Sequence, residues 1–142
     1  MREILYRAKS LYRGEGWVYG QPRHYALEIR REKWTMFDPY TGIETDIAEE
    51  TIGLYTGMTD KNGNKIYEGD IATLISRAVI TYGKMVNVKF KFKKGGIYAY
   101  LLGKDYLIRN VPIGDIREEV EITVIGNIYD NPELLRVGKN EK

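Results

Sequence analysis

The pattern of apolar and polar positions along the chain predicts strands and almost no helix. Residues 85–92 alternate strictly, because every second residue from Val86 to Phe92 is apolar and Asn or Lys stands between. This period of two is typical of a strand with one buried face. No stretch keeps a helical period over the roughly 11 residues of an average helix. We therefore predict a mostly β protein with only short helical turns.

Further strands are indicated by alternation or by β-branched and aromatic runs between turn signals. These segments are residues 3–8, 17–19, 24–31, 33–37, 71–75, 78–82, 97–102, 106–108 and 120–128. Gly20-Gln-Pro22 is expected to end the second of them, which leaves His24 as an exposed loop residue. One helical turn is predicted over residues 46–50 with Asp46 as its cap. A second is predicted over residues 131–135, with Pro132 at the first helical position.

A hairpin is predicted near the middle of the chain. Asn62-Gly63 lies between two apolar-containing runs, and this dipeptide is a strong hairpin signal because both residues tolerate positive φ. A second turn at Glu68-Gly69-Asp70 leads into the next strand. Together the polar tip and the second turn form a motif, which consists of Asp60, Asn62, Gly63, Tyr67, Glu68, Gly69 and Asp70. We expect this motif to be a structural turn rather than a site.

Composition narrows the class of protein. The chain has 142 residues, 43% of them hydrophobic, which is enough for a sizeable core. It has no cysteine, so disulfides and thiolate metal sites are excluded. No apolar run approaches the roughly 18 residues that span a membrane, and the N-terminus lacks the apolar core of a signal peptide. We expect a soluble cytoplasmic protein with no membrane partner.

Charge is distributed unevenly along the chain. The formal net charge is only +2, but residues 71–109 carry eight basic side chains and a single acidic one. Residues 1–70 and 110–142 are both slightly acidic. This change of charge near residue 70 coincides with a change of composition, and it suggests a division into a segment 1–70, including the hairpin, and a segment 71–142.

The basic segment holds the candidate binding residues. Lysines alternate along the strand at residues 85–92 and continue past its ends, and tyrosines lie nearby in sequence. The predicted binding set is Lys84, Lys89, Lys91, Lys93, Lys94, Tyr82, Tyr98 and Tyr100. Lysines that meet phosphates beside rings that stack on bases are typical of single-stranded nucleic-acid binding. Two alternatives stay open: an aromatic groove for a peptide, and lysines that protect an edge strand from aggregation.

Catalytic and metal-binding interpretations are weaker. The run from Asp60 to Asn64 resembles a calcium loop, but the sixth and twelfth positions hold Lys65 and Ile71 instead of Gly and Glu. Glu68 and Asp70 could act as an acid–base pair, although such carboxylates more often accept N–H bonds in turns. A single histidine without cysteine supplies no usual nucleophile pair or metal set. We expect no enzyme activity, no cofactor and no metal.

Three segments resemble the YopX family of bacteriophages and prophages of Gram-positive bacteria. They are residues 4–8, similar to the opening Phe-Arg-Ala-Trp pattern of the family, residues 55–71 with the hairpin, and residues 124–135. The segments lie in the family's order and cover nearly the whole chain. Lys9 departs from the pattern, because an aromatic residue is usual there.

The resemblance implies an N-terminal strand-rich half packed on a C-terminal SH3-like barrel, or one continuous domain over residues 1–136. No activity is established for the family, so it implies no mechanism. We therefore expect a non-enzymatic phage or prophage protein in the bacterial host cytoplasm that binds a protein partner or nucleic acid. The alternatives are an architectural protein that self-associates into a homo-oligomer and, more weakly, a hydrolase that uses carboxylates.

Overall fold

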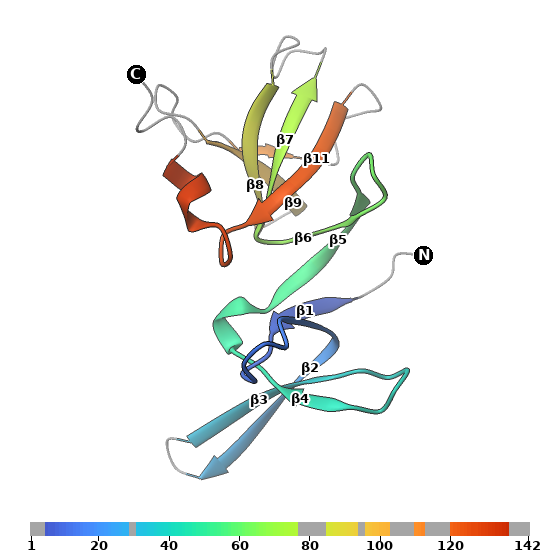
Figure 1. The fold of residues 1–142 in the computed structure, drawn as a ribbon, viewed down its shortest axis with the longest axis vertical. Coiled ribbons are helices and arrows are strands. Elements are labelled where there is room, and N and C mark those ends of the chain that lie inside the picture. The colour runs from blue at the N-terminus through green and yellow to red at the C-terminus, as the bar shows by residue number, and fades with distance from the viewer. Residues whose placement is uncertain are drawn as a thin grey trace. The chain divides into compact units, whose positions relative to one another are not determined.

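The structure of this protein is a computed structural model that describes residues 5–28, 31–76, 85–93, 96–102, 110–112 and 120–136. Most of these residues lie in strands, so the mostly β prediction is confirmed (Figure 1). The strands are β1 (Tyr6–Lys9), β2 (Trp17–Glu28), β3 (Arg31–Phe37), β4 (Glu44–Asp46), β5 (Gly53–Thr59), β6 (Lys65–Tyr67), β7 (Asp70–Ser76), β8 (Met85–Lys93), β9 (Gly96–Leu102), β10 (Asn110–Pro112) and β11 (Val120–Asn127). Two short 3₁₀ helices are described, η1 (Glu49–Thr51) and η3 (Pro132–Arg136). The strands predicted over residues 78–82 and 106–108 lie outside the described residues.

The chain forms two compact units, Met1–Gly57 and Met58–Lys142. We call them the N-terminal unit and the C-terminal unit. The change from one to the other falls inside β5, so the hairpin tip belongs to the C-terminal unit. The division near residue 70 that charge and composition suggest does not coincide with this boundary, and it stays a prediction.

Strand β2 changes its partner halfway along. Its first part pairs with β1, from Trp17 opposite Lys9 to Gly20 opposite Tyr6, and its second part pairs with β3 from Gln21 onward. The predicted strand end at residues 20–22 is therefore wrong. Gly20 is required because a Cβ there would lie 2.1 Å from the carbonyl oxygen of Phe37. Pro22 is tolerated because β1 has already ended, so one side of β2 needs no N–H donor at this point.

The helical turn predicted over residues 46–50 is found as η1, at Glu49–Thr51, but the prediction that Asp46 is its cap is wrong. Asp46 is the last residue of β4, and η1 begins three residues later with Ala48 as its N-cap. Thr51 fixes this turn, because its hydroxyl donates to the Ala48 carbonyl at 2.7 Å and accepts from the Lys9 N–H at 2.8 Å. The second predicted helical turn is confirmed as η3.

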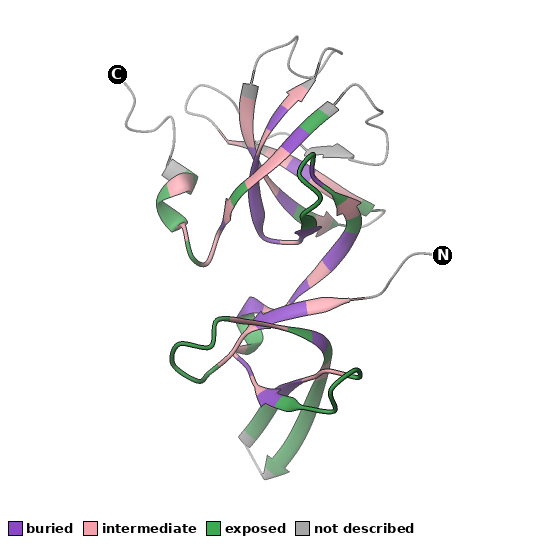
Figure 2. Cartoon of the chain, turned by 45° about the vertical axis from the view of Figure 1, so that its right-hand side comes forward, coloured by how far each residue is buried: buried purple, intermediate pink, exposed green. Residues whose placement is uncertain are grey.

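His24 lies in β2 and not in a loop. Its ring stacks on Trp34 of β3, with centroids 4.6 Å apart, and its Nε2 atom lies 3.0 Å from a carboxylate oxygen of Glu32. Both side chains of the ion pair are well exposed. Residues 21–27 of β2 are almost all exposed, so His24 is part of the solvent-exposed surface of the β2–β3 ribbon (Figure 2).

The N-terminal unit has a small core. Buried side chains from β1, β3 and the bridge between Ser10 and Ile47 meet there, surrounded by partly buried apolar neighbours. The buried residues are Ala8, Met36 and Ile47, and the neighbours are Tyr6, Val18, Trp34 and Ile52. The strands of this unit are adjacent in the order β4-β3-β2-β1-β5.

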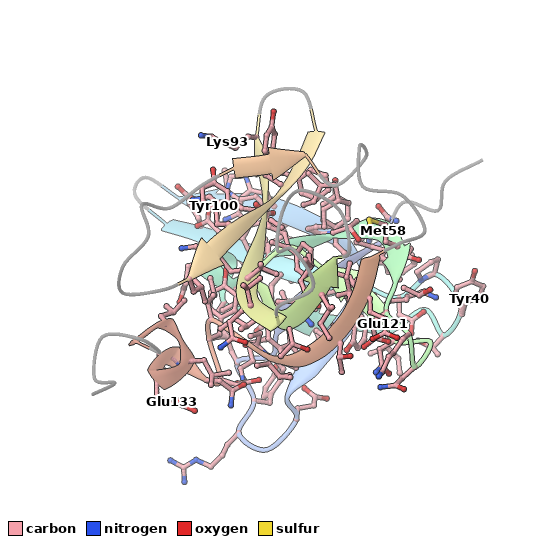
Figure 3. All side chains as sticks on the ribbon, turned by 90° about the horizontal axis from the view of Figure 1, so that it is seen from above. Tyr40, Met58, Lys93, Tyr100, Glu121 and Glu133 are labelled. Atoms are coloured by element: carbon pink, nitrogen blue, oxygen red, sulfur yellow. The ribbon has the colours of Figure 1, made fainter. Side chains whose placement is uncertain are left out.

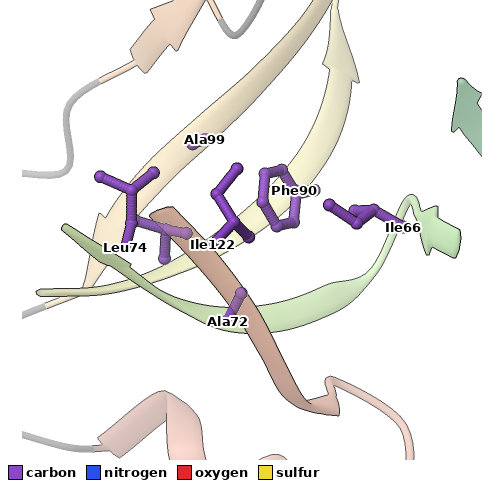
Figure 4. Packing of buried hydrophobic residues seen from close by; sticks show 7 residues of the cluster. Ile66, Ala72, Leu74, Phe90, Ala99 and Ile122 are labelled. Carbon is purple, nitrogen blue, oxygen red and sulfur yellow. The ribbon is translucent and has the colours of Figure 1, made fainter. Parts of the chain in front are cut away.

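The C-terminal unit contains an antiparallel sheet in the order β10-β9-β8-β7-β11. Among the described residues β10 and β11 are the two edges and do not pair, so this sheet is open and the SH3-like barrel is not confirmed. Its core fills one face of the sheet (Figure 4). The buried members are Ile66, Ala72, Leu74, Val88, Phe90, Ala99 and Ile122. No helix in the described part of the chain is long and apolar enough to cross a membrane.

Candidate nucleic-acid interface

Strand β8 has one buried and one open side, as its sequence predicts. Val88 and Phe90 are 0% and 1% exposed and point into the core. Lys91 and Lys93 are exposed, and Lys89 is partly exposed. Because successive strand residues point to opposite faces, the three lysines share the face opposite the core.

Strand β9 places two tyrosines on the same face. Lys89 is directly opposite Tyr100 and Lys91 is directly opposite Tyr98. Directly paired residues of an antiparallel sheet have neighbouring side chains on one face. The ammonium groups of Lys89 and Lys93 lie 6.0 and 5.7 Å from the ring centroid of Tyr100 (Figure 3). We call these three lysines with Tyr98 and Tyr100 the lysine face.

The position of β8 in the sheet counts against edge protection as the reason for its lysines. β8 pairs with β9 from Asn87 to Lys93 and with β7 from Met85 to Lys89. Beyond Lys89, the second turn takes the place of β7, because the Gly69 N–H donates to the Phe90 carbonyl and Glu68 accepts the Phe92 N–H. These contacts cover the side of β8 that would otherwise be an open edge.

No carboxylate in the described part of the chain pairs with the ammonium groups of the lysine face. Within the described part of the chain, none of the three makes an ion pair. The other predicted binding residues, Tyr82, Lys84 and Lys94, lie outside the described residues. The structure thus brings together five of the eight predicted residues and says nothing about the remaining three.

The hairpin motif is organised around one buried carboxylate. Asp60 is 6% exposed and its Oδ1 accepts the N–H groups of Asn62 and Asn64, both at 2.9 Å. Its Oδ2 accepts the Val124 N–H of β11 at 3.0 Å, 64 residues further along the chain. The tip is a five-residue loop over residues 60–64, in which Gly63 has a φ of +86°.

These hydrogen bonds determine the acidity of Asp60. Burial by itself raises its pKa, but the N–H groups of Val124, Asn64 and Asn62 outweigh that effect and hold the pKa below the ordinary value of 3.8. Asp60 is therefore ionised at neutral pH and fully used as an acceptor. Its hydrogen bonds link the hairpin tip to β11.

The other two carboxylates of the motif are also tied to backbone groups. Asp70 is 2% exposed and accepts the Tyr67 N–H at 2.8 Å across the Glu68-Gly69 turn. Glu68 accepts the Phe92 N–H of β8 at 3.2 Å. No group of three or more His, Cys, Asp or Glu able to hold a metal is found among the described residues. The three carboxylates of the motif thus stabilise its turns by accepting backbone N–H groups.

The second turn is joined to the segment after β11, which sequence reasoning missed. The Ile128 N–H donates to the Gly69 carbonyl at 2.9 Å. Asn127 then forms a tight turn, because its side-chain oxygen accepts the N–H groups of Tyr129 at 2.9 Å and Asp130 at 2.8 Å. Contacts between segments so far apart leave no local pattern in the sequence. They show that both halves of the hairpin motif contact the C-terminal segment.

Comparison with known proteins adds fold and family. A crystal structure of protein EF1440 from Enterococcus faecalis matches 95% of this chain and 99% of its own, with 22% identity and a TM-score of 0.51. That likeness concerns the fold alone. No curated protein matches the chain. The sequence model described as YopX protein matches residues 5–136, which include the second and third segments that carried the resemblance and all but the first residue of the first segment. The chain therefore belongs to the YopX family.

Proposed function

We propose that this protein is a non-enzymatic binding module that holds single-stranded nucleic acid on the lysine face. The observation that carries the proposal is the register of β8 and β9, which sets Lys89 and Lys91 opposite Tyr100 and Tyr98. We also propose that the protein originates in a phage or prophage and acts in the cytoplasm of a bacterial host. The same proposal assigns an SH3-like barrel to the C-terminal unit. The antiparallel sheet around a single core supports the barrel.

The spacing of the lysines suits a backbone of repeating phosphates. Alternate residues of a strand are about 7 Å apart, so Lys89, Lys91 and Lys93 follow one another along β8. None of the three has an ion-pair partner in the described part of the chain, and the ammonium groups of Lys89 and Lys93 lie near the Tyr100 ring instead. Each flexible stem can therefore bring its ammonium group to a phosphate without breaking an ion pair. Neutralised phosphates release counterions, which supplies sequence-independent affinity.

The tyrosines supply the second half of the interaction. Tyr98 and Tyr100 are partly exposed, so part of each ring is open to solvent beside the lysines. A base that stacks on an aromatic ring contributes about 1–3 kcal/mol whatever its identity. We therefore expect binding with little sequence preference, and single strands preferred over a duplex whose bases are hidden.

The use of the carboxylates supports the non-enzymatic part of the proposal. Asp60 and Asp70 are buried and hydrogen-bonded to backbone N–H groups, and Glu68 accepts an N–H from β8. A general acid or base needs a free oxygen in reach of a substrate. Carboxylates whose oxygens accept backbone N–H groups in this way stabilise the fold.

Salt dependence tests the proposal. Binding of fluorescein-labelled 20-nucleotide DNA and RNA single strands would be measured by anisotropy from 50 to 200 mM NaCl. Three phosphate contacts predict a slope of log K against log salt of about −2, and the Lys89→Glu/Lys91→Glu variant should reduce it to about −0.7 or abolish binding. Lys61→Glu/Lys65→Glu is the matched control, because it makes the same change of charge at exposed residues of the hairpin.

Tyrosine variants separate stacking from charge. Tyr100→Ala should weaken binding by about tenfold with the salt slope unchanged, because the number of phosphate contacts stays the same. Circular dichroism would check that each variant is folded. If the lysine variant binds as tightly as the wild type, or the control loses as much affinity, the lysine face is not the interface.

A further inference from the structure

The N-terminal unit contains a pocket that no pattern in the sequence predicts. It has a volume of about 290 Å³ and lies at the loops over residues 10–16 and 38–43, beside β2, β3 and β4. Its walls are mainly apolar, with two carboxylates among the lining groups. The residues used below are Val18, Tyr19, Met36 and Ile43, with the acidic Glu15 and Asp38.

Both acidic residues are held in place by their own loops. The Ser10 hydroxyl donates to Glu15 Oε1 at 2.5 Å. Asp38 Oδ1 accepts the N–H groups of Tyr40 at 2.9 Å and Thr41 at 3.4 Å. These bonds position the carboxylates before any ligand arrives, and preorganisation of this kind raises affinity because less is lost on ordering.

The negative charge of the pocket is not balanced within the structure. Neither Glu15 nor Asp38 makes an ion pair with any described residue. Met36 is buried at 1% exposure, and Val18 is partly buried, so the inner wall is apolar. The complement to this pocket is a cation on an apolar stem.

Large apolar side chains stand exposed around the same two loops. Tyr40 is 93% exposed, Leu11 63%, Ile43 61% and Tyr12 58%. Figure 3 shows Tyr40 projecting outward from its loop. Ile43 also lines the pocket, and Leu11, Tyr12 and Tyr40 belong to the two loops at its edge. Exposed apolar side chains that gather at one place mark protein interaction sites.

We propose that this pocket binds an arginine side chain presented by an apolar segment of a partner protein. The guanidinium offers five N–H donors in a planar fork, which suits two carboxylates, and it stacks on an aromatic ring such as Tyr19. Its aliphatic stem lies along Val18 and Met36. Apolar neighbours of the arginine cover Leu11, Tyr12, Tyr40 and Ile43. The pocket volume of about 290 Å³ lies just below the roughly 300–1,000 Å³ of small-molecule sites, and it has room for a whole arginine side chain.

Blocked tripeptides provide a defined probe. The ¹⁵N-labelled full chain would be titrated with acetyl-Leu-Arg-Leu-amide and with the same peptide carrying citrulline, which keeps the shape and loses the charge. The arginine peptide should shift the amide signals of residues 15, 19, 38 and 40–43. It should bind about tenfold more tightly than the citrulline peptide, because hydrogen bonds to charged groups are the stronger ones.

Substitutions test the role of the carboxylates. Glu15→Gln/Asp38→Asn keeps the shapes of both side chains and should reduce affinity for the arginine peptide about tenfold. Glu49→Gln/Glu50→Gln removes the same charge from exposed residues of η1 in the same unit and should change it less than twofold. The proposal is overturned if the citrulline peptide binds equally well, if both variants lose affinity equally, or if the shifted signals lie outside the pocket.

Discussion

Replacement of Asp60 by alanine should destabilise the C-terminal unit more than its place at a hairpin tip suggests. The carboxylate joins three backbone N–H groups, two inside the loop and one on β11. Asn62 and Asn64 are exposed, so water can replace Asp60 as their acceptor. Val124 is partly buried in a strand, so its N–H has no ready substitute.

The expected loss follows from these partners. A buried donor left without an acceptor costs about 1–3 kcal/mol, and loss of the bonds that shape the loop adds about 1 kcal/mol. We therefore expect the free energy of unfolding to fall by about 2–4 kcal/mol in Asp60→Ala. Asp60→Asn should lose about half as much, because one of its two atoms still accepts while the other becomes a donor facing an N–H.

Urea unfolding followed by circular dichroism measures the loss, and hydrogen exchange at the Val124 amide locates it. Glu133→Ala, at an exposed residue of η3, is the control and should stay within about 0.5 kcal/mol of the wild type. If Asp60→Ala changes stability no more than the control, or the Val124 amide keeps its protection, Asp60 does not link the hairpin tip to β11 as we infer.

The acid dependence of stability gives a second measurement on the same residue. Because the folded pKa of Asp60 lies below its ordinary value of 3.8, its contribution is complete above that pH. It is lost as the pH falls below 3.8 and through the folded pKa. The difference in stability between wild type and Asp60→Asn should therefore be constant near neutral pH and shrink in acid. A difference that grows in acid would contradict the assigned hydrogen bonds.

Three further predictions concern other parts of the structure. Gly126→Ala should lower stability by about 1–3 kcal/mol in urea unfolding, because the added Cβ would lie 2.4 Å from Asn131 Oδ1; unchanged stability would contradict that contact. Phe90→Ala should lower it by about 3–5 kcal/mol, since the ring is 1% exposed in the core, and a loss under 1 kcal/mol would mean the core is packed otherwise. The hydroxyls of Thr35 and Tyr25 lower the pKa of Glu44, so carbon NMR should find this pKa below 4.5. Tyr25→Phe should raise the pKa of Glu44, and an unchanged pKa in this variant would exclude the Tyr25 hydrogen bond.

Sequence periodicity was sufficient where structure depends on neighbours in the chain. The alternation along β8 correctly assigned Val88 and Phe90 to the core and the lysines to the opposite face. The hairpin at Asn62-Gly63 and the helical turn after Asn131 were also correct, because turn residues act locally.

The errors arose where long-range pairing overrides a local signal. Gly20 and Pro22 indicate a break by composition, yet β2 continues through them because it exchanges β1 for β3 at that point. Asp46 has the chemistry of a helix cap, yet it pairs with Thr35 in the sheet. The pocket of the N-terminal unit was missed because its lining residues come from segments that only the sheet brings together.

The residues that identify the family and the residues proposed to bind belong to different parts of the structure. The family segments contain Asp60, Gly69 and Val124, whose contacts join a hairpin to a strand 64 residues away. Closing so long a loop has an entropic cost that a few strong bonds must offset, which explains why so specific a motif is needed at this point. Strand β7 follows the hairpin directly, and β8 pairs with it. The contacts of Asp60 and Gly69 therefore lie next to the sheet that carries the lysine face, although neither residue belongs to that face. It follows that loss of Asp60 should weaken nucleic-acid binding only through the fold, whereas loss of Lys89 and Lys91 should weaken it with the fold intact.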